Sequence, residues 1–127
     1  TLIANRFEAK QSGTICVISS VAGDRGRASN YVYGSAKAMV TAFTSGLRQR
    51  LYKSNVSVVT IKPGFVDTPM TSELKKGILW AKPNIVSALI VKAIDKNKAE
   101  IYVPLFWFGV LIIIKNIPNF MFKKLDL

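Results

Sequence analysis

Two side chains near the start of a predicted long helix have the types and spacing needed for acid–base chemistry. Tyr33 and Lys37 are four residues apart, so on a helix they share one face and can approach each other. An ammonium group beside a phenol favours the phenolate, the form in which a tyrosine acts as a base near neutral pH. Ser20 offers a hydroxyl group that can donate to a substrate carbonyl oxygen while negative charge develops there. These three residues are the candidate catalytic set.

The spacing of Tyr33 and Lys37 is weak evidence when taken alone. The same pair also arises by chance on the solvated face of an amphipathic helix. Two neighbours of the set have a structural interpretation. Tyr31 has Ser35 rather than a lysine four residues on, so we expect it to be a pocket or structural residue. Ser19 faces the opposite side of a strand from Ser20 and is expected to be structural.

The elements that must position these residues alternate between helices and strands. We expect the end of a helix over 1–11, strands over 14–19, 56–61 and 99–103, and helices over 31–52 and from 83 onward. The first strand is a short continuous apolar run, which is typical of a strand buried on both faces of a parallel sheet. The alternation predicts an α/β fold, a doubly wound parallel sheet with right-handed crossovers. Ligands of such sheets bind beyond the carboxyl ends of the strands, where Ser20, Pro63 and Gly64 fall.

Composition restricts the kinds of partner. The chain has 18 Lys and Arg against 7 Asp and Glu, a formal net charge of +11, which favours nucleic acid or an anionic membrane surface as partner. The basic residues are scattered, Arg25 and Arg27 among them, as on an ordinary solvated surface. No nucleic-acid-binding motif accompanies them, so we expect no nucleic-acid partner. Cys16 lies in an apolar run and is expected to be a small core residue in a reducing compartment. No metal site is expected.

The beginning of the sequence indicates a piece of a longer protein. A chain of 127 residues has room for one domain. The first residue is Thr1 rather than a methionine, and Leu2, Ile3 and Phe7 already recur at helical spacing.

Several segments, in this order and at these separations, resemble the short-chain dehydrogenase/reductase family. Ser20 lies thirteen residues before Tyr33. The segments are Ile18-Ser19-Ser20-Val21-Ala22-Gly23, Tyr33-Gly34-Ser35-Ala36-Lys37 and Pro63-Gly64-Phe65-Val66-Asp67-Thr68. The resemblance extends to about Pro104. It implies a Rossmann-like fold seen from its fifth strand onward, with 1–104 as the C-terminal part of that domain and 105–127 as a hydrophobic, basic tail.

The resemblance also implies an activity and a role for each matching residue. The activity is hydride transfer between NAD(H) or NADP(H) and a ketone or secondary alcohol. Tyr33 resembles the proton donor and acceptor, Lys37 the residue that tunes it and binds the nicotinamide ribose, and Ser20 the hydroxyl that orients substrate.

The loop that starts at Pro63 and Gly64 resembles the one that holds the nicotinamide carboxamide, through Val66 and Thr68. The family's glycine-rich turn, its active-site asparagine and the residue that selects NAD or NADP belong before Thr1. We therefore expect the shown residues alone to be inactive.

The end of the chain is rich in large apolar side chains. Residues 105–114 are ten uncharged residues, and as a helix they would cover ~15 Å, about half of a bilayer's hydrocarbon core. One interpretation is a C-terminal core or oligomer-interface segment. The other, which we favour, is an amphipathic patch in the membrane interface with its lysines near anionic headgroups. It predicts a cytoplasmic protein at the inner face of the cell membrane.

The tail, with Val21-Ala22-Gly23-Asp24-Arg25-Gly26-Arg27 and Ser29-Asn30-Tyr31-Val32-Tyr33-Gly34-Ser35, is similar to one subgroup of this family. That subgroup is the reductase component of decaprenylphosphoryl-ribose 2-epimerase. The similarity implies a polyprenyl-phosphate-linked 2-keto-pentose as substrate, a flavin-dependent oxidase as partner, and a homo-oligomer for the full-length protein. Two alternatives stay open. One is a family member that acts on a 3-oxoacyl, steroid or retinoid ketone, and the other is a truncated, non-catalytic binding module.

Overall fold

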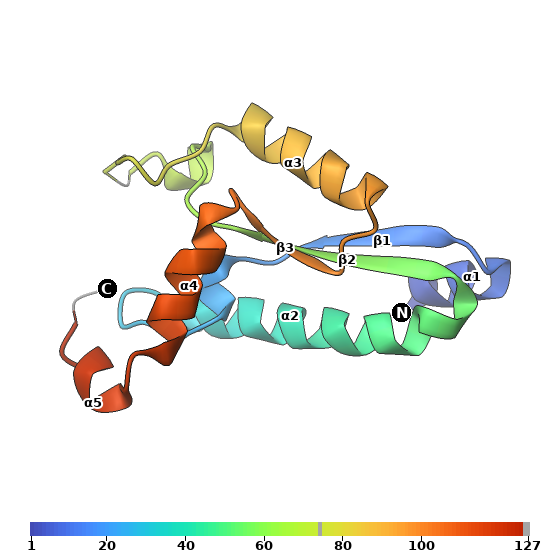
Figure 1. The fold of residues 1–127 in the computed structure, drawn as a ribbon, viewed down its shortest axis with the longest axis horizontal. Helices are drawn as coiled ribbons and strands as arrows, with labels where there is room; N and C mark the ends of the chain where they lie inside the picture. The colour runs from blue at the N-terminus through green and yellow to red at the C-terminus, as the bar shows by residue number, and fades with distance from the viewer. Residues whose placement is uncertain (74, 126–127) are drawn as a thin grey trace.

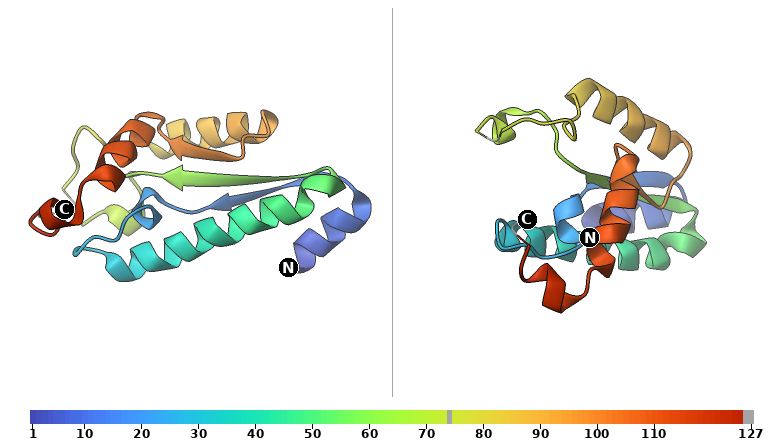
Figure 2. Two further views of the ribbon diagram at one scale, coloured as in Figure 1. Left: turned by 60° about the horizontal axis from the view of Figure 1, so that its bottom comes forward. Right: turned by 60° about the vertical axis from the view of Figure 1, so that its left-hand side comes forward.

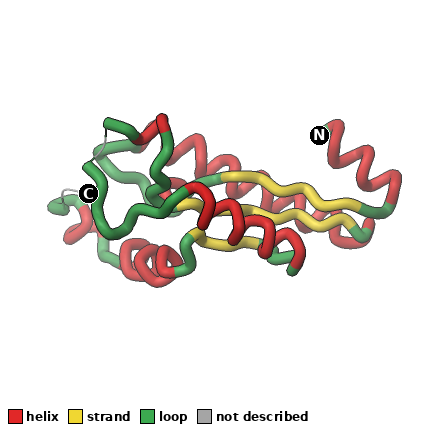
Figure 3. Tube along the Cα trace, turned by 90° about the horizontal axis from the view of Figure 1, so that it is seen from above, coloured by secondary structure: helices red, strands yellow, loops and turns green. Residues whose placement is uncertain are grey.

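The computed structural model describes residues 1–73 and 75–125, and its centre is a three-stranded parallel sheet. The strands are β1 (Gly13–Ile18), β2 (Val56–Pro63) and β3 (Glu100–Val103), in that spatial order. All three lie within two residues of the predicted ranges. Figure 3 shows them running side by side, with the longer loops gathered at one end of the sheet.

Helices cover both faces of this sheet. Helix α2 (Tyr31–Leu51) runs along one face and α3 (Pro83–Asp95) along the other, while α1 (Leu2–Lys10) lies at the amino-terminal end of the strands (Figure 1). Three short 3-10 turns complete the connections: η1 (Val21–Gly23), η2 (Tyr52–Ser54) and η3 (Pro69–Thr71). A parallel sheet with helices on both faces confirms the predicted α/β class.

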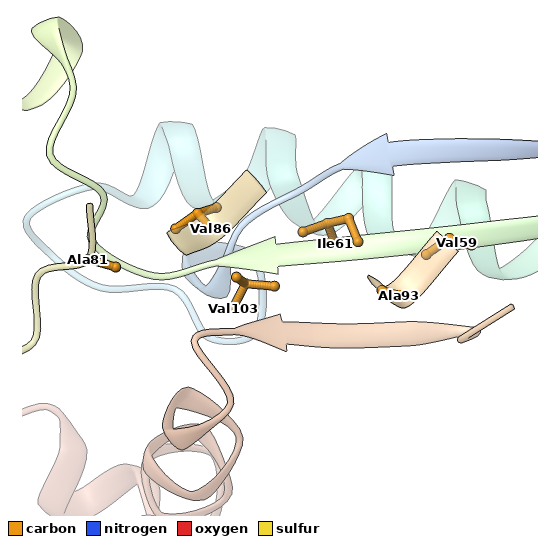
Figure 4. Packing of buried hydrophobic residues seen from close by; sticks show 6 residues of the cluster. All are labelled: Val59, Ile61, Ala81, Val86, Ala93 and Val103. Carbon is orange, nitrogen blue, oxygen red and sulfur yellow. The ribbon is translucent and has the colours of Figure 1, made fainter. Parts of the chain in front are cut away.

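The central strand β2 is buried on both faces because its side chains alternate between two apolar clusters. Val56 and Val58 pack with Leu47 and Leu51 of α2. The residues facing α3 form the second cluster, shown in Figure 4: Val59, Ile61, Ala81, Val86, Ala93 and Val103. Cys16 packs against this second cluster, and burial raises the pKa of its thiol. A strand with two buried faces explains why its sequence lacks a simple apolar–polar alternation.

Helix α2 buries only part of its large apolar side chains. Leu47 and Leu51 are buried against the sheet, whereas Val32, Met39 and Phe43 are exposed. The exposed residues leave an apolar face on α2 that the described part of the chain does not cover.

The C-terminal tail folds as two further helices, α4 (Phe106–Asn116) and α5 (Asn119–Phe122). Figure 2 shows them at the same end of the sheet as the loops that follow β1 and β2. Trp107 and Leu111 of α4 are buried against Tyr102 of β3, so one side of α4 is core. Phe108 and Ile113 on the same helix are exposed. No helix in the described ranges is long and apolar enough to cross a membrane.

Candidate active site

Ser20 lies where β1 gives way to the short turn η1. The strand is prolonged by the backbone N–H of Ser19, which donates to the Ile61 carbonyl oxygen at 2.8 Å. Ser20 then adopts an extended backbone and caps η1, because its Oγ accepts a hydrogen bond from the N–H of Ala22 at 3.1 Å. A hydroxyl that accepts one bond in this way keeps its own proton available for a further acceptor.

Two glycines let the backbone of η1 touch the backbone of α2. A Cβ atom on Gly23 would lie 2.7 Å from the Lys37 carbonyl carbon, and one on Gly34 would lie 2.9 Å from the Ala22 oxygen. Any side chain at these positions would push turn and helix apart. Glycine at both positions therefore sets how closely the Ser20 turn approaches the helix that carries Tyr33.

Tyr33 and Lys37 lie on adjacent turns of α2, as predicted, near the carboxyl end of the sheet. The Lys37 Nζ atom is 5.7 Å from the centroid of the Tyr33 ring and donates a hydrogen bond to the Ile18 carbonyl oxygen at 3.1 Å. Tyr33 is partly exposed. The lysine is thus held by the end of β1, with its ammonium group beside the tyrosine ring.

The two neighbours differ from the candidate set in their contacts. The Ser19 hydroxyl donates to the Lys37 carbonyl oxygen at 3.0 Å and shares a hydrogen bond of 2.7 Å with the Thr41 hydroxyl. It fastens β1 to α2, so its predicted structural role is confirmed. Tyr31 is largely exposed.

Ser20 and Tyr33 line one pocket of about 260 Å³, together with Phe65 and Met70. Lys37 is not part of its wall. A larger hollow of about 830 Å³ follows the end of α2 and contains none of the predicted site residues. The smaller pocket brings Ser20 and Tyr33 together, and Tyr33 also borders a separate hollow at the start of α2.

Arg27 is the one charged residue that lines this pocket in the described part of the chain. Its guanidinium has no hydrogen-bond or ion-pair partner among residues 1–73 and 75–125. Asn30 lines the same pocket, and its Oδ1 atom is buried without a hydrogen-bond partner in these ranges. Beside the candidate catalytic groups, the pocket wall therefore has a guanidinium group (Arg27) and an amide oxygen (Asn30) that bind no other described residue.

The loop after β2 is ordered by its own hydrogen bonds. Pro63 is the last residue of β2, and the N–H of Gly64 donates to the Val103 oxygen at 3.0 Å. The Thr71 hydroxyl donates to the Val66 oxygen at 2.7 Å and accepts from the Thr68 N–H at 3.1 Å. Gly64 lines the pocket, whereas Pro63, Val66 and Thr68 do not.

A buried ionic network lies behind the site, and sequence reasoning did not find it. The ammonium of Lys62 contacts Asp24 and Glu100, each at 2.7 Å, and the Tyr102 hydroxyl donates to the other Asp24 oxygen at 2.5 Å. Burial lowers the pKa of Lys62, but the two carboxylates outweigh it and raise that pKa overall. Burial, followed by the Asp24 carboxylate, raises the pKa of Tyr102 to about 12. A lysine inside the apolar segment 56–63 was the available signal, because a buried charge needs partners.

Arg25 is also not the solvated surface residue that the sequence predicted. Its guanidinium is bonded to the carboxyl end of α4 and to α5. Those partners are about ninety residues away along the chain, so no local pattern could indicate them.

Comparison with protein families identifies the chain. The model of the family described as short chain dehydrogenase matches residues 1–78, well over half of the sequence. The chain belongs to the short-chain dehydrogenase family. An uncharacterised oxidoreductase of Mycobacterium tuberculosis is 33% identical over 125 residues, which are 98% of this chain and 50% of the relative. The 3-oxoacyl-[acyl-carrier-protein] reductase of Bos taurus is 30% identical over 73% of this chain and 38% of its own length. The chain spans about half the length of its first relatives.

Solved short-chain dehydrogenases share the fold. The crystal structure of one from Burkholderia cenocepacia superposes with a TM-score of 0.71 at 20% identity, over 78% of this chain and 40% of the other. A bulky-bulky ketone specific alcohol dehydrogenase from Comamonas testosteroni gives a TM-score of 0.70 at 22% identity, over 92% of this chain and 48% of the other. These likenesses confirm that the three strands and their helices are part of the family's Rossmann-like domain.

Proposed function

We propose that the full-length protein is an NAD(P)-dependent oxidoreductase that interconverts a ketone and a secondary alcohol. In this proposal Tyr33 gives or takes the proton at the substrate oxygen, Ser20 donates a hydrogen bond to that oxygen, and Lys37 places its ammonium group beside the phenol and binds the nicotinamide ribose. The observation that carries the proposal is that Ser20 and Tyr33 line one pocket with the Lys37 ammonium beside the tyrosine ring.

The residues present fit a nicotinamide cofactor. An ammonium has three donors, and Lys37 uses one of them on the Ile18 oxygen, which leaves two for the ribose hydroxyls. The loop from Pro63 and Gly64, through Val66 and Thr68, would hold the carboxamide. The cofactor, when bound, supplies or accepts the hydride at the carbinol carbon. The structure from Burkholderia cenocepacia is a complex with NADP, which supports a cofactor of this class.

For the substrate, we propose a ketone linked to a polyprenyl phosphate, such as a 2-keto-pentose, made by a flavin-dependent oxidase partner. Arg27 supports an anionic substrate because it is the one charged residue lining the described pocket and has no partner there. The alternative is a 3-oxoacyl, steroid or retinoid ketone, and the name of the bovine relative favours the first of these. Comparing turnover of a polyprenyl-phosphate ketose with that of uncharged soluble ketones separates the two.

The surface supports two kinds of partner. Exposed Phe108, Ile113 and Phe120 lie on α4 and α5, whose sequence also carries Lys115, Lys123 and Lys124. Apolar side chains flanked by lysines suit an anionic membrane surface, and we place the enzyme at the inner face of the cell membrane, in the cytoplasm. The exposed apolar face of α2 suits a second copy of the protein, so we propose a homo-oligomer.

The substitution Tyr33→Phe tests the proposed reaction in the full-length protein. It removes the transferable proton and keeps the ring, so turnover should fall 10²-fold or more while the Kd for the cofactor changes little. Tyr31→Phe is the matched control, because that tyrosine lies two residues away and is largely exposed. Turnover of Tyr33→Phe equal to that of the control would rule out Tyr33 as the proton donor and acceptor, and no turnover in the wild type would favour the non-catalytic alternative.

A further inference from the structure

The guanidinium of Arg25 caps the carboxyl end of α4. Its Nη1 atom donates to the carbonyl oxygens of Ile114 at 2.5 Å, Lys115 at 3.2 Å and Ile117 at 2.7 Å. The last carbonyls of a helix have no partner within the helix and carry partial negative charge, so a cation at this point satisfies and stabilises them.

The same guanidinium also binds α5. Its Nη2 atom donates to Asn119 Oδ1 at 3.0 Å, and its central carbon lies 3.7 Å from the centroid of the Phe122 ring. The planar guanidinium has five donors in a fixed arrangement and can stack on an aromatic ring, which a lysine cannot reproduce. Arg25 therefore joins both tail helices to the segment that precedes α2.

The adjacent residue, Asp24, attaches the same segment to the sheet. Its carboxylate is buried and binds Lys62 of β2 at 2.7 Å and Tyr102 of β3. One residue thus faces the sheet and the next faces the tail. The segment is therefore held by the sheet through Asp24 and by the tail through Arg25.

This segment also forms part of the pocket wall. It begins directly after η1, which Ser20 caps, and leads into α2, which carries Tyr33. Arg27 and Asn30 within it line the pocket. Because the segment is short and fixed at Asp24 and Arg25, a shift at Arg25 changes the position of the pocket wall between the two candidate catalytic residues.

We propose that Arg25 is a positioning residue for the reaction, through which the C-terminal helices α4 and α5 hold the segment between Ser20 and Tyr33 in its productive arrangement. The inference rests on the proposed function for its kinetic part. Arg25 acts through its contacts with the tail and takes no part in the chemistry.

The kinetic test uses Arg25→Ala and Arg25→Lys in the full-length enzyme. A displacement of about 1 Å in a positioning element can cost 10²-fold in rate, so kcat with a fixed ketone should fall about 10- to 10²-fold in Arg25→Ala, while the Kd for the cofactor stays unchanged. Arg25→Lys should recover only part of the loss. Added guanidinium ion should raise kcat of Arg25→Ala and leave the wild type unaffected. The matched control is Arg50→Ala, which removes an ion pair with Glu8 and a bond to Asn5 at the opposite end of the molecule, and kcat should not change.

A double-mutant cycle tests whether the effect runs through the tail. Phe122→Ala should lower kcat in the wild type and have little further effect in Arg25→Ala, because the contact is already lost. Fully additive effects, or an unchanged kcat in Arg25→Ala, would overturn the proposal and leave Arg25 as a helix cap only.

Hydrogen exchange gives a measurement that does not depend on activity. In Arg25→Ala the amides of Gly23 and Asp24, which bond to Ser20 and Val21, should exchange faster, together with those at the end of α4. Faster exchange in α4 and α5 alone would also contradict the proposal. If Tyr33→Phe stays active while exchange behaves as stated, the proposed reaction has failed and the coupling of tail to pocket wall stands.

Discussion

The indole of Trp107 lies directly against the backbone of Gly64, since a Cβ atom on Gly64 would fall 1.9 Å from Trp107 Nε1. The contact joins α4 to the loop after β2, which the family resemblance assigns to the nicotinamide. Phe65, the next residue, packs its ring edge-on against the same indole at 5.4 Å between centroids. The tail is thus packed against the candidate cofactor loop as well as against the segment held by Arg25.

The contact between Gly64 and Trp107 makes the glycine irreplaceable. We predict that Gly64→Ala in the full-length protein lowers the free energy of unfolding by about 1–3 kcal/mol, because the indole must move to admit one methyl group. Gly109→Ala is the control, since its Cβ would meet nothing within 4 Å and alanine favours a helix. That variant should be neutral or more stable by up to about 1 kcal/mol. Urea unfolding of both variants measures the difference, and equal stabilities would contradict the packing argument.

The buried network should tolerate the loss of one member poorly. Lys62→Met leaves the Asp24 carboxylate buried, with Tyr102 as its remaining partner in the described part of the chain, so we expect a loss of about 3–5 kcal/mol in unfolding free energy. Lys76→Met breaks the ion pair between Lys76 and Asp67, whose side chains are 51% and 43% exposed respectively. This loss should lower the unfolding free energy by about 0–1 kcal/mol. Chemical denaturation of the two variants at pH 7 makes the comparison. A similar small cost in both would mean that Lys62 is solvated.

Alkaline pH should weaken the fold through the same network. The folded pKa of Tyr102 is raised to about 12 and that of Lys62 is raised above its ordinary value of 10.5. A group with a raised folded pKa contributes its full stability below the unfolded pKa and loses it as pH rises towards the folded one. Stability should therefore fall between pH 10 and 12. In Tyr102→Phe the fall should be shallower, and an equally steep fall would remove Tyr102 as its cause.

Lys37 is expected to serve both the phenol and the cofactor. Lys37→Ala should lower turnover and weaken cofactor binding together, because one ammonium group is expected to lie beside the phenol and to bind the ribose. Lys53→Ala is a control for the loss of one positive charge, because Lys53 does not line the pocket. A lower turnover with an unchanged Kd for the cofactor in Lys37→Ala would contradict the ribose contact.

Membrane binding can be tested on the exposed side of the tail alone. Deleting the tail is uninformative, because Trp107 and Leu111 are core residues. We predict that Ile113→Ser with Phe120→Ser abolishes sedimentation with anionic liposomes, whereas Ile78→Ser, at a residue 99% exposed elsewhere, does not. Added salt should weaken wild-type binding without eliminating it, since salt screens the lysines and not the apolar contact. Wild-type protein that ignores liposomes at low salt would leave the oligomer interface as the better interpretation of this surface.

The fold and the proximity of Tyr33 and Lys37 could be predicted from the sequence, because both depend on local periodicity and short spacing. An unbroken apolar run marked β1, and Tyr33 and Lys37 needed only one helical turn to meet. The tail was predicted only in part, since Trp107 is buried and Phe108 exposed. Which side of an all-apolar helix faces the core depends on what packs against it, and the sequence of that helix does not contain this information.

The contacts that the sequence did not predict are those between distant segments. Arg25 and Ile114 are 89 residues apart and Asp24 and Tyr102 are 78 residues apart. Each pair is brought together by the parallel sheet, which places the end of every strand at one edge. The sequence does not show whether a basic side chain is solvated or binds the end of a helix. Arg25 could therefore not be distinguished from its solvated neighbours.

The network of Lys62, Asp24, Glu100 and Tyr102 has a consequence for how relatives of this protein can diverge. Removing one partner leaves an unpaired charge buried away from water, whereas replacing the whole set with apolar residues of similar volume often leaves the stability unchanged. We therefore expect selection to remove single substitutions at these four positions, and we expect the four to change together between branches of the family. Co-variation between residues 24, 62, 100 and 102, in relatives that keep the Ser20 and Tyr33 pair, would be the evolutionary trace of this one buried lysine.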